Sequence, residues 1–184
     1  MITMKDIIRE GHPTLAKVAT EVPIPLSKED VKLMNDMLQF IINSQTPEIA
    51  EKYQLRESVG LAAPQLNLDK RIIAVHTEDE KGKLYSLALA NPKIVSYSEE
   101  MTYLPMGEGC LSVNDEVQGY VPRYAKVTVK GYDVLTDQEV KIVARGFLSI
   151  CLQHELDHFE GTLFYDRINK ENPLAPIPNA MVID

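Results

Sequence analysis

The chain has 184 residues, of which 45% are hydrophobic and 25% are charged, a composition typical of one globular domain and not of a disordered chain. Its formal net charge of −8 at pH 7 argues against broad electrostatic attraction to nucleic acid or to an anionic membrane. The first residues resemble no signal peptide and no apolar run is long enough to span a bilayer, so we expect a cytoplasmic protein with no membrane partner.

The N-terminal third predicts two helices followed by an irregular loop. Ser27 is a good N-cap residue, and apolar residues at helical spacing predict an amphipathic helix over residues 28–44, with a short helix over residues 47–54. Residues 55–68 contain small residues, glycine and proline but have no amphipathic period. This composition indicates backbone that lies close to another group.

Alternating apolar and polar residues predict several strands further along the chain. The expected strands cover residues 71–76, 84–90, 93–98, 124–133 and 139–144. Asn91-Pro92 is expected to end the second of them, and Thr136-Asp137 is expected to turn the last pair. Residues 162–168 are predicted to be extended. We expect one catalytic domain over residues 1–171 and a C-terminal tail with little structure over residues 172–184.

A predicted helix over residues 146–160 carries the strongest chemical signal. His154 and His158 are four residues apart, so they share one helix face and can bind a single metal ion. Glu155 lies beside them and is free to take a proton from water, as in metal hydrolases. Apolar residues on two sides of this helix indicate that it is central and buried, and buried histidines need partners.

A catalytic site of this type needs a third protein ligand and an open position. In metzincin peptidases the third ligand would fall at position 164, which is Phe in this chain. Thermolysin-like enzymes use a Glu about twenty residues downstream, where residues 172–183 offer no acidic side chain. Cys110 is the better candidate, because a thiolate in a glycine-flanked loop can reach the helix.

Three segments together resemble the peptide deformylase family. They are SVGLAAPQ at residues 58–65, EGCLS at residues 108–112 and QHELDH at residues 153–158, and they occur in the order found in the family. The resemblance extends from the N-terminus to about Asn172, and the opening residues are similar to the branch common in Gram-positive bacteria. The fold expected is α+β, with small, mostly antiparallel sheets around a central metal-bearing helix.

The resemblance implies a metal-dependent hydrolase that removes the N-formyl group from the N-terminal methionine of nascent polypeptides and releases formate. One divalent ion per chain would be held by Cys110, His154 and His158, with Fe²⁺ as the physiological ion and Zn²⁺, Ni²⁺ or Co²⁺ as substitutes. Glu155 would take a proton from the attacking water and then protonate the departing amine.

The resemblance also implies that the oxygen gaining negative charge is held by the ion, the Leu111 backbone N–H and the Gln65 side-chain amide. Phe147, Ile150 and Cys151 lie one and two turns before His154 on the same helix face, so they are expected to line a slot for the methionine side chain.

Backbone groups are expected to bind the rest of the substrate. Val59 and Gly60 could pair with the substrate backbone as an added strand, and Gly109 lies in a loop whose backbone is open to a ligand. The expected partners are formyl-methionyl ends of nascent chains, without direct nucleic-acid binding. Any ribosome contact would lack a basic C-terminal docking helix, because no Lys or Arg follows Glu171.

Three residues depart from the family pattern. Ser58 stands where the family usually has Gly, and Met106 and Leu152 also differ from close relatives, with effects on activity that the sequence leaves open. Glu108 and Arg123 are predicted to form an ion pair that holds the second motif. Two alternatives stay open at this point, a zinc peptidase that uses the same H-E-x-x-H chemistry and a non-catalytic module with a structural metal.

Overall fold

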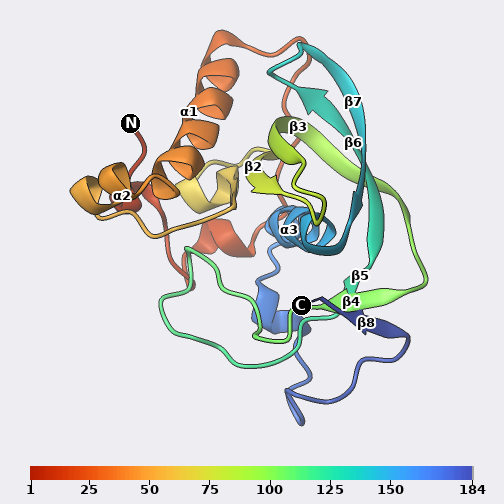
Figure 1. Cartoon of the computed structure of the whole chain (residues 1–184). Coiled ribbons are helices and arrows are strands. Elements are labelled where there is room, and N and C mark those ends of the chain that lie inside the picture. The colour runs from red at the N-terminus through yellow and green to blue at the C-terminus, as the bar shows by residue number, and fades with distance from the viewer. Residues whose placement is uncertain (184) are drawn as a thin grey trace.

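Two β-sheets surround a central helix, α3 (Gly146–Asp157), in the computed structural model, which describes residues 1–183 (Figure 1). The larger sheet has the strand order β1-β2-β3-β6-β7, and every neighbouring pair in it is antiparallel. Its strands are β1 (Gly60–Ala62), β2 (Ile72–Glu78), β3 (Leu84–Tyr97), β6 (Lys126–Asp133) and β7 (Gln138–Arg145). The predicted α+β fold is confirmed.

A smaller sheet has the order β5-β4-β8. It is formed by β4 (Met101–Tyr103), β5 (Arg123–Tyr124) and β8 (Ala180–Val182). The long loop between β4 and β5 runs along one side of α3 and carries Cys110 (Figure 1). The smaller sheet therefore holds both ends of the loop that supplies the second motif.

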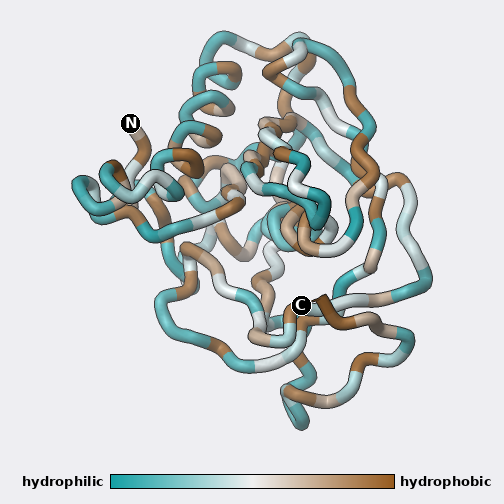
Figure 2. Tube along the Cα trace, viewed as in Figure 1, coloured by the Kyte–Doolittle hydropathy of each residue, from teal (hydrophilic) through white to brown (hydrophobic). Residues whose placement is uncertain are grey.

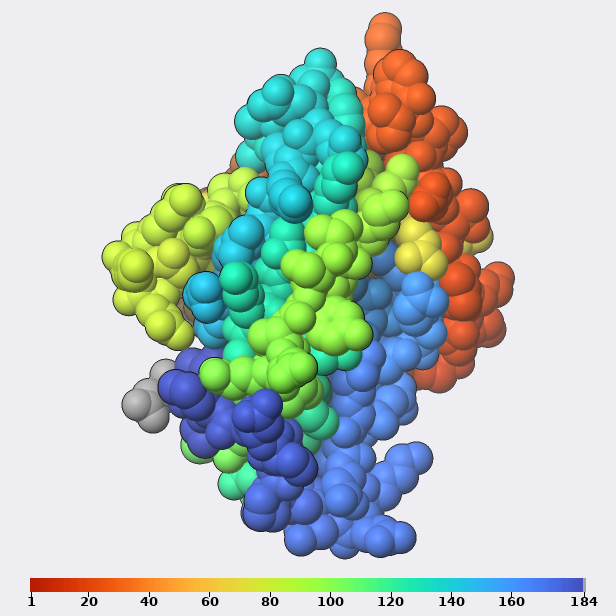
Figure 3. All heavy atoms as spheres, turned by 90° about the vertical axis from the view of Figure 1, so that its right-hand side faces the viewer, coloured from red at the N-terminus to blue at the C-terminus, as the bar shows by residue number. Residues whose placement is uncertain are grey.

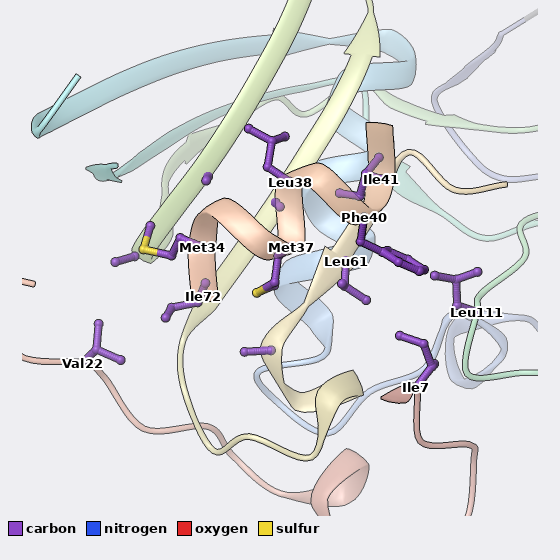
Figure 4. Close-up of a cluster of buried hydrophobic side chains, with 14 of the residues drawn as sticks. Ile7, Val22, Met34, Met37, Leu38, Phe40, Ile41, Leu61, Ile72 and Leu111 are labelled. Carbon is purple, nitrogen blue, oxygen red and sulfur yellow. The ribbon is translucent and has the colours of Figure 1, made fainter. Parts of the chain in front are cut away.

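The two predicted N-terminal helices are α1 (Lys28–Ser44) and α2 (Pro47–Tyr53). Helix α1 begins where expected, because the Ser27 hydroxyl accepts a hydrogen bond from the Asp30 N–H at 3.1 Å. Brown and teal residues alternate along its turns in Figure 2, as the amphipathic pattern predicts. Its apolar face packs on the larger sheet and reaches the loop at Leu111 (Figure 4). Burial of this face therefore fixes a backbone segment of the predicted site.

Helix α3 is buried on nearly all sides, as its sequence predicts. Leu148 and Leu152 pack against the larger sheet, whereas Ile150 faces a cavity, and all three side chains are at most 2% exposed. The helix ends at Asp157 with His158 as its C-cap, three residues earlier than predicted. The chain turns away at Gly161, which has φ = 68° and lies so close to the Ala16 backbone that a side chain would not fit.

Strand β3 is longer than the sequence predicts. We expected Asn91-Pro92 to end it, but pairing with β6 resumes at Lys93 after a shift in register. Asn91 has φ = 51°, and its side chain bonds the C=O and N–H of Val22 at 2.9 and 2.8 Å. The prediction was wrong because Asn tolerates positive φ and Pro is compatible with a bulge.

Two predictions for the C-terminal segment were also wrong. Residues 162–168 were expected to be extended, but Phe164–Arg167 form a 3₁₀ helix, η4. The tail of residues 172–184, described as far as residue 183, was expected to have little structure, but β8 pairs in parallel with β4. Figure 3 shows this segment in dark blue, in the lower part of the face that is turned toward the viewer. Nothing local in the tail sequence indicates a strand, because Met181 pairs with Thr102, which lies 79 residues earlier in the chain.

Within residues 1–183, none of the helices combines the length and the apolar character that crossing a bilayer requires.

Candidate active site

Helix α3 and the loop between β4 and β5 bring the three predicted metal ligands together. His154 and His158 come from the end of the helix, and Cys110 comes from the loop. The ligand atoms of these three residues all lie within 4.8 Å of one another, and all three residues are buried. The cluster joins segments that are far apart in the chain, because Cys110 and His158 are separated by 48 residues.

The cluster has the dimensions of a metal site. Cys110 Sγ lies 3.6 Å from His158 Nε2. A sulfur and a nitrogen bound tetrahedrally to one ion at their usual distances of about 2.3 and 2.1 Å would be about 3.6 Å apart. A thiolate and two imidazoles suit several transition-metal ions. The residues present therefore fit a bound divalent ion.

Glu108 orients one of the ligands. Its carboxylate accepts a hydrogen bond from His154 Nδ1 at 2.8 Å and two from Arg123 at 2.8 and 2.9 Å. Burial alone would raise the pKa of Glu108, but the bonds from His154 and Arg123 outweigh it and lower the pKa to about 2. The predicted ion pair of Glu108 and Arg123 is confirmed, and it leaves Nε2 of His154 free for an ion.

A chain of alternating charges continues from Arg123 to the protein surface. Arg123 is buried and also donates to Asp157 at 2.6 Å. Asp157 in turn accepts two hydrogen bonds at 2.7 Å from Arg167, whose side chain is 46% exposed. Glu108, Arg123 and Asp157 thus each have an oppositely charged partner, as burial of a charge requires. Sequence reasoning missed the roles of Asp157 and Arg167.

The two histidines differ in their electrostatic surroundings. Burial lowers the pKa of His158 well below its ordinary value. Burial also acts to lower the pKa of His154, but hydrogen bonds with Cys110 and Glu108 outweigh it and raise that pKa well above the ordinary value. A neutral imidazole is the form that binds metal, so protons and an ion compete for His154.

Glu155 is buried beside the ligands and faces the first motif. Its Oε2 atom has no hydrogen-bond partner within residues 1–183. A Cβ atom at Gly60 would lie only 2.7 Å from Glu155 Oε1, so the carboxylate packs directly on the glycine backbone. Burial raises the pKa of Glu155 to about 7. The arrangement leaves one buried carboxylate oxygen without a hydrogen-bond partner, as expected of a group that exchanges a proton with a bound reactant.

Gln65 places its amide next to the ligand cluster. Its Oε1 atom accepts a hydrogen bond from the Ala62 N–H at 2.9 Å, which fixes the orientation of the amide. Its Nε2 atom lies 3.4 Å from Cys110 Sγ and 3.2 Å from Ser112 Oγ. The Leu111 N–H has no backbone acceptor in the described part of the chain. Two donors predicted to act together are thus both beside Cys110.

The N-terminal segment clamps these two donors, which sequence reasoning did not anticipate. The Ile8 N–H donates to Gln65 O at 2.8 Å. Arg9 donates from Nη1 to Leu111 O at 2.5 Å, and the Glu10 N–H donates to Ser112 O at 2.8 Å. Residues 8–10 therefore tie the first motif to the second.

A cavity of about 360 Å³ opens beside Glu155. Its walls include the predicted substrate-binding residues, namely Val59, Gly60, Gly109, Phe147, Ile150 and Cys151. Burial raises the pKa of the Cys151 thiol, which therefore stays protonated as a wall of the cavity. Arg56 and Leu104 also line it and were not predicted, because neither belongs to a recognisable motif.

The three departures from the family pattern have different positions. Ser58 lines the cavity and does not have the positive φ that would require glycine. Leu152 is fully buried against the larger sheet, and Met106 is 94% exposed. Neither Leu152 nor Met106 is among the residues that line the cavity.

Phe164 stands at the sequence position where metzincin peptidases have their third ligand. Its ring packs against His154 with 6.1 Å between ring centroids, so the phenyl group supports a ligand and coordinates nothing. A cysteine sulfur, two imidazoles and a buried carboxylate, gathered beside an open cavity, are the groups that a metal-dependent hydrolase requires.

Comparisons with known proteins specify the class further. The family model described as polypeptide deformylase matches residues 4–173. The peptide deformylase of Oceanobacillus iheyensis is 58% identical over 173 residues, which cover 94% of each chain. Peptide deformylase 2 of Bacillus subtilis (strain 168) is 54% identical over 184 residues and 100% of both chains.

Solved structures of peptide deformylases are also similar to this chain. The crystal structure of a probable peptide deformylase from Synechococcus phage S-SSM7 has a TM-score of 0.71 at 32% identity and covers 88% of this chain and 98% of that one. The Met-Ala-Ser-bound class I type b peptide deformylase of Acinetobacter baumannii has a TM-score of 0.68 at 30% identity, with 88% and 96% covered.

The chain belongs to the peptide deformylase family. It is a hydrolase that removes the N-formyl group from nascent polypeptides that begin with formyl-methionine. The relatives from Bacillales confirm the predicted Gram-positive branch. Membership of this family excludes the peptidase and the non-catalytic module that the sequence alone left open.

Proposed function

We propose that Glu155 is the general base and general acid of the deformylation. The observation that carries this proposal is its buried Oε2 atom, which lacks a partner within residues 1–183 and lies beside the ligand cluster. Glu155 takes a proton from the attacking water at this oxygen and gives it to the amine nitrogen that becomes the new N-terminus. The contact with Gly60 holds the carboxylate in place for both transfers.

Cys110, His154 and His158 hold one divalent ion per chain in this proposal. A bound ion would act as a Lewis acid, which would polarise the formyl group and lower the pKa of a water molecule. Fe²⁺ is the proposed physiological ion, with Zn²⁺, Ni²⁺ or Co²⁺ as substitutes, since this donor set accepts all four. Glu108 supports the set by keeping the His154 ring in one orientation.

Two donors stabilise the oxygen that gains negative charge as the formyl carbon is attacked. They are the Leu111 backbone N–H, which follows Cys110 in the chain, and the Gln65 Nε2 group, which lies 3.4 Å from Cys110 Sγ. The amide is a suitable group because it donates a hydrogen bond without adding a net charge. Its anchorage to Ala62 N–H means that little reorganisation is needed during the reaction.

The substrate occupies the cavity of about 360 Å³. Phe147, Ile150 and Cys151 form the slot for the methionine side chain, and the backbone of Val59, Gly60 and Gly109 pairs with the peptide. Support comes from the relative of Acinetobacter baumannii, which is described as bound to Met-Ala-Ser. Residues 1–171 act as a single catalytic domain. We infer that the protein acts in the cytoplasm, because nascent chains are made there. Residues 172–184 contain no Lys or Arg, so this segment offers no basic helix for a ribosome contact.

Formate release from formyl-Met-Ala-Ser tests the proposal. Protein loaded anaerobically with Fe²⁺ is compared with Glu155→Gln, which keeps the shape of the side chain but cannot accept the proton. We expect the variant to bind one ion per chain and to lose about 10²- to 10⁴-fold in kcat/KM. Glu160→Gln, an exposed acid shortly after α3, is the matched control and should keep wild-type activity. A Glu155→Gln protein as active as the wild type would refute the assigned role.

A further inference from the structure

Ser58 lies at the wall of the active-site cavity, immediately before an edge strand. Strand β1 pairs only with β2 among the strands that the structure describes, so its other edge faces the cavity. The His76 N–H donates to Val59 O at 2.9 Å, and Gly60 stands opposite Val75. Hydrogen-bonded and non-hydrogen-bonded pairs alternate along an antiparallel ladder. The N–H and C=O of Gly60 therefore point away from β2, toward the open edge.

The Ser58 hydroxyl forms hydrogen bonds with both of these outward-pointing groups. Its Oγ atom accepts a hydrogen bond from the Gly60 N–H at 3.2 Å and donates one to Gly60 O at 2.7 Å. A hydroxyl can make both bonds because it has one donor and two acceptor sites. The next outward N–H, that of Ala62, is taken by Gln65 Oε1. The edge that could receive a peptide is thus already satisfied by side chains of this chain.

The Ser58 backbone is itself held in position. Its N–H donates to Ser44 Oγ at 3.1 Å, and its C=O accepts a bond from Gln45 Nε2 at 2.9 Å. The hydroxyl is therefore carried on a backbone anchored to the end of α1, and it can release Gly60 by rotation of one side-chain bond. A Gly at this position would have the same anchors and no hydroxyl.

We propose that Ser58 sets the affinity for the peptide substrate, because its hydroxyl competes with the substrate backbone for Gly60. This inference rests on the proposed addition of the substrate as a strand along β1. When the peptide binds, its own N–H and C=O replace the Ser58 hydroxyl at Gly60, so each binding event breaks two internal hydrogen bonds. The competition weakens the binding of every peptide that uses this edge and leaves the proton-transfer groups untouched.

The sign of the effect follows from this exchange. Ser58→Ala leaves the Gly60 groups open to water and substrate, so the KM for formyl-Met-Ala-Ser should fall about 2- to 10-fold, the range expected when a competing hydrogen bond is removed. The kcat should change little. Ser58→Thr keeps a hydroxyl on the same carbon and should retain the higher KM. A merely structural role of Ser58 would instead make the Ala variant bind its substrate more weakly.

Ser44→Ala is the matched control for a loosened loop. It removes the anchor of the Ser58 N–H and keeps the hydroxyl on Gly60, so it should lower thermal stability without lowering the KM. A fall in KM in Ser44→Ala equal to that in Ser58→Ala would assign the effect to loop mobility and overturn the proposal.

Hydrogen exchange provides a readout that does not depend on turnover. In zinc-loaded protein the Gly60 amide should exchange faster in Ser58→Ala than in the wild type or Ser58→Thr, and addition of the tripeptide Met-Ala-Ser should slow it again. An unchanged or higher KM in Ser58→Ala, with equal Gly60 exchange, would reject the competition while wild-type deformylation stands. Absence of formate release from the wild type would instead reject the proposed function.

Discussion

The contact between Gly60 and Glu155 joins a backbone position to an acid-base group. Gly60 has no need of unusual backbone angles, since its φ is not positive. Glycine is required here for lack of space, because a Cβ atom would overlap the Glu155 side chain at Oε1, Cδ and Cγ. The absence of a side chain at Gly60 is therefore part of how Glu155 is positioned.

Gly60→Ala should displace the Glu155 carboxylate and spare the metal ligands. We expect kcat to fall by about 10²-fold or more, in line with the cost of misplacing a catalytic group by about 1 Å. Zinc affinity, measured by competition with a chelator, should stay within about threefold of the wild type. Leu61→Val, a change at the neighbouring core position, is a control for altered packing of β1. Equal losses in both variants would show that Gly60 acts only through the strand.

Glu108 makes the metal-free protein sensitive to acid. Its folded-state pKa of about 2 lies below the ordinary value of 4.5, so its contribution to stability is present above pH 4.5 and is lost as the pH falls from 4.5 to 2. A shift of this size corresponds to about 3 kcal/mol. NMR titration of the Glu108 carboxyl carbon in the metal-free protein checks the direction, and a pKa at or above 4.5 would contradict the ion-paired arrangement.

The N-terminal segment, residues 8–10, supports the active site through contacts with main-chain groups. Arg9 holds the carbonyl of Leu111, whose N–H is a proposed donor to the reacting oxygen. Ile8 holds Gln65 in the same way. Residues 8–10 therefore fix the relative positions of two motifs.

Arg9→Ala should reduce kcat more than it changes KM. We expect about a 10-fold loss in kcat, smaller than the 10²- to 10³-fold loss on deleting an oxyanion donor outright, because Leu111 keeps its N–H and loses only its support. Metal content should be unchanged. Lys5→Ala, an exposed basic residue nearby, serves as the control. A selective rise in KM would place Arg9 in substrate binding instead.

Elements with a strong local signal could be predicted from the sequence. The N-cap residue Ser27 and the apolar period predict helix α1. Two apolar faces around the histidines predict α3. Strand β8 and the continuation of β3 could not be predicted, because they depend on partners distant in the chain. The early end of α3 depends on the Gly161 contact with Ala16, which is also non-local.

The residues of the candidate site also differ in whether the sequence predicts them. Cys110, His154 and Glu155 stand in motifs whose chemistry is visible in the residue types. Arg9 acts through a hydrogen bond to Leu111 O, and Arg167 acts through two hydrogen bonds to Asp157. Arginines are too common in protein sequences for such roles to be distinguished without the structure.

For the whole molecule, a bound ion should act as a cross-link between the helix and the loop. A ligand present at a thousand times its dissociation constant stabilises the folded state by about 4 kcal/mol. For a chain of this length that amounts to a rise in Tm on the order of 10 °C. Differential scanning calorimetry before and after removal of zinc by a chelator measures the shift. Glu155→Gln should show the same shift, and an equal Tm with and without zinc would contradict the assignment of the three ligands.

The burial of α3 also determines where this enzyme can diverge in evolution. Substitutions on the faces of α3 that pack beside the ligands disturb a close-packed core, and most of them will be removed by selection for folding. The cavity rim at Arg56 and Leu104 lies in loops that tolerate change. Lineages can therefore acquire new peptide preferences, or escape an inhibitor that reaches the rim, while the machinery that hydrolyses the formyl group is inherited almost unaltered.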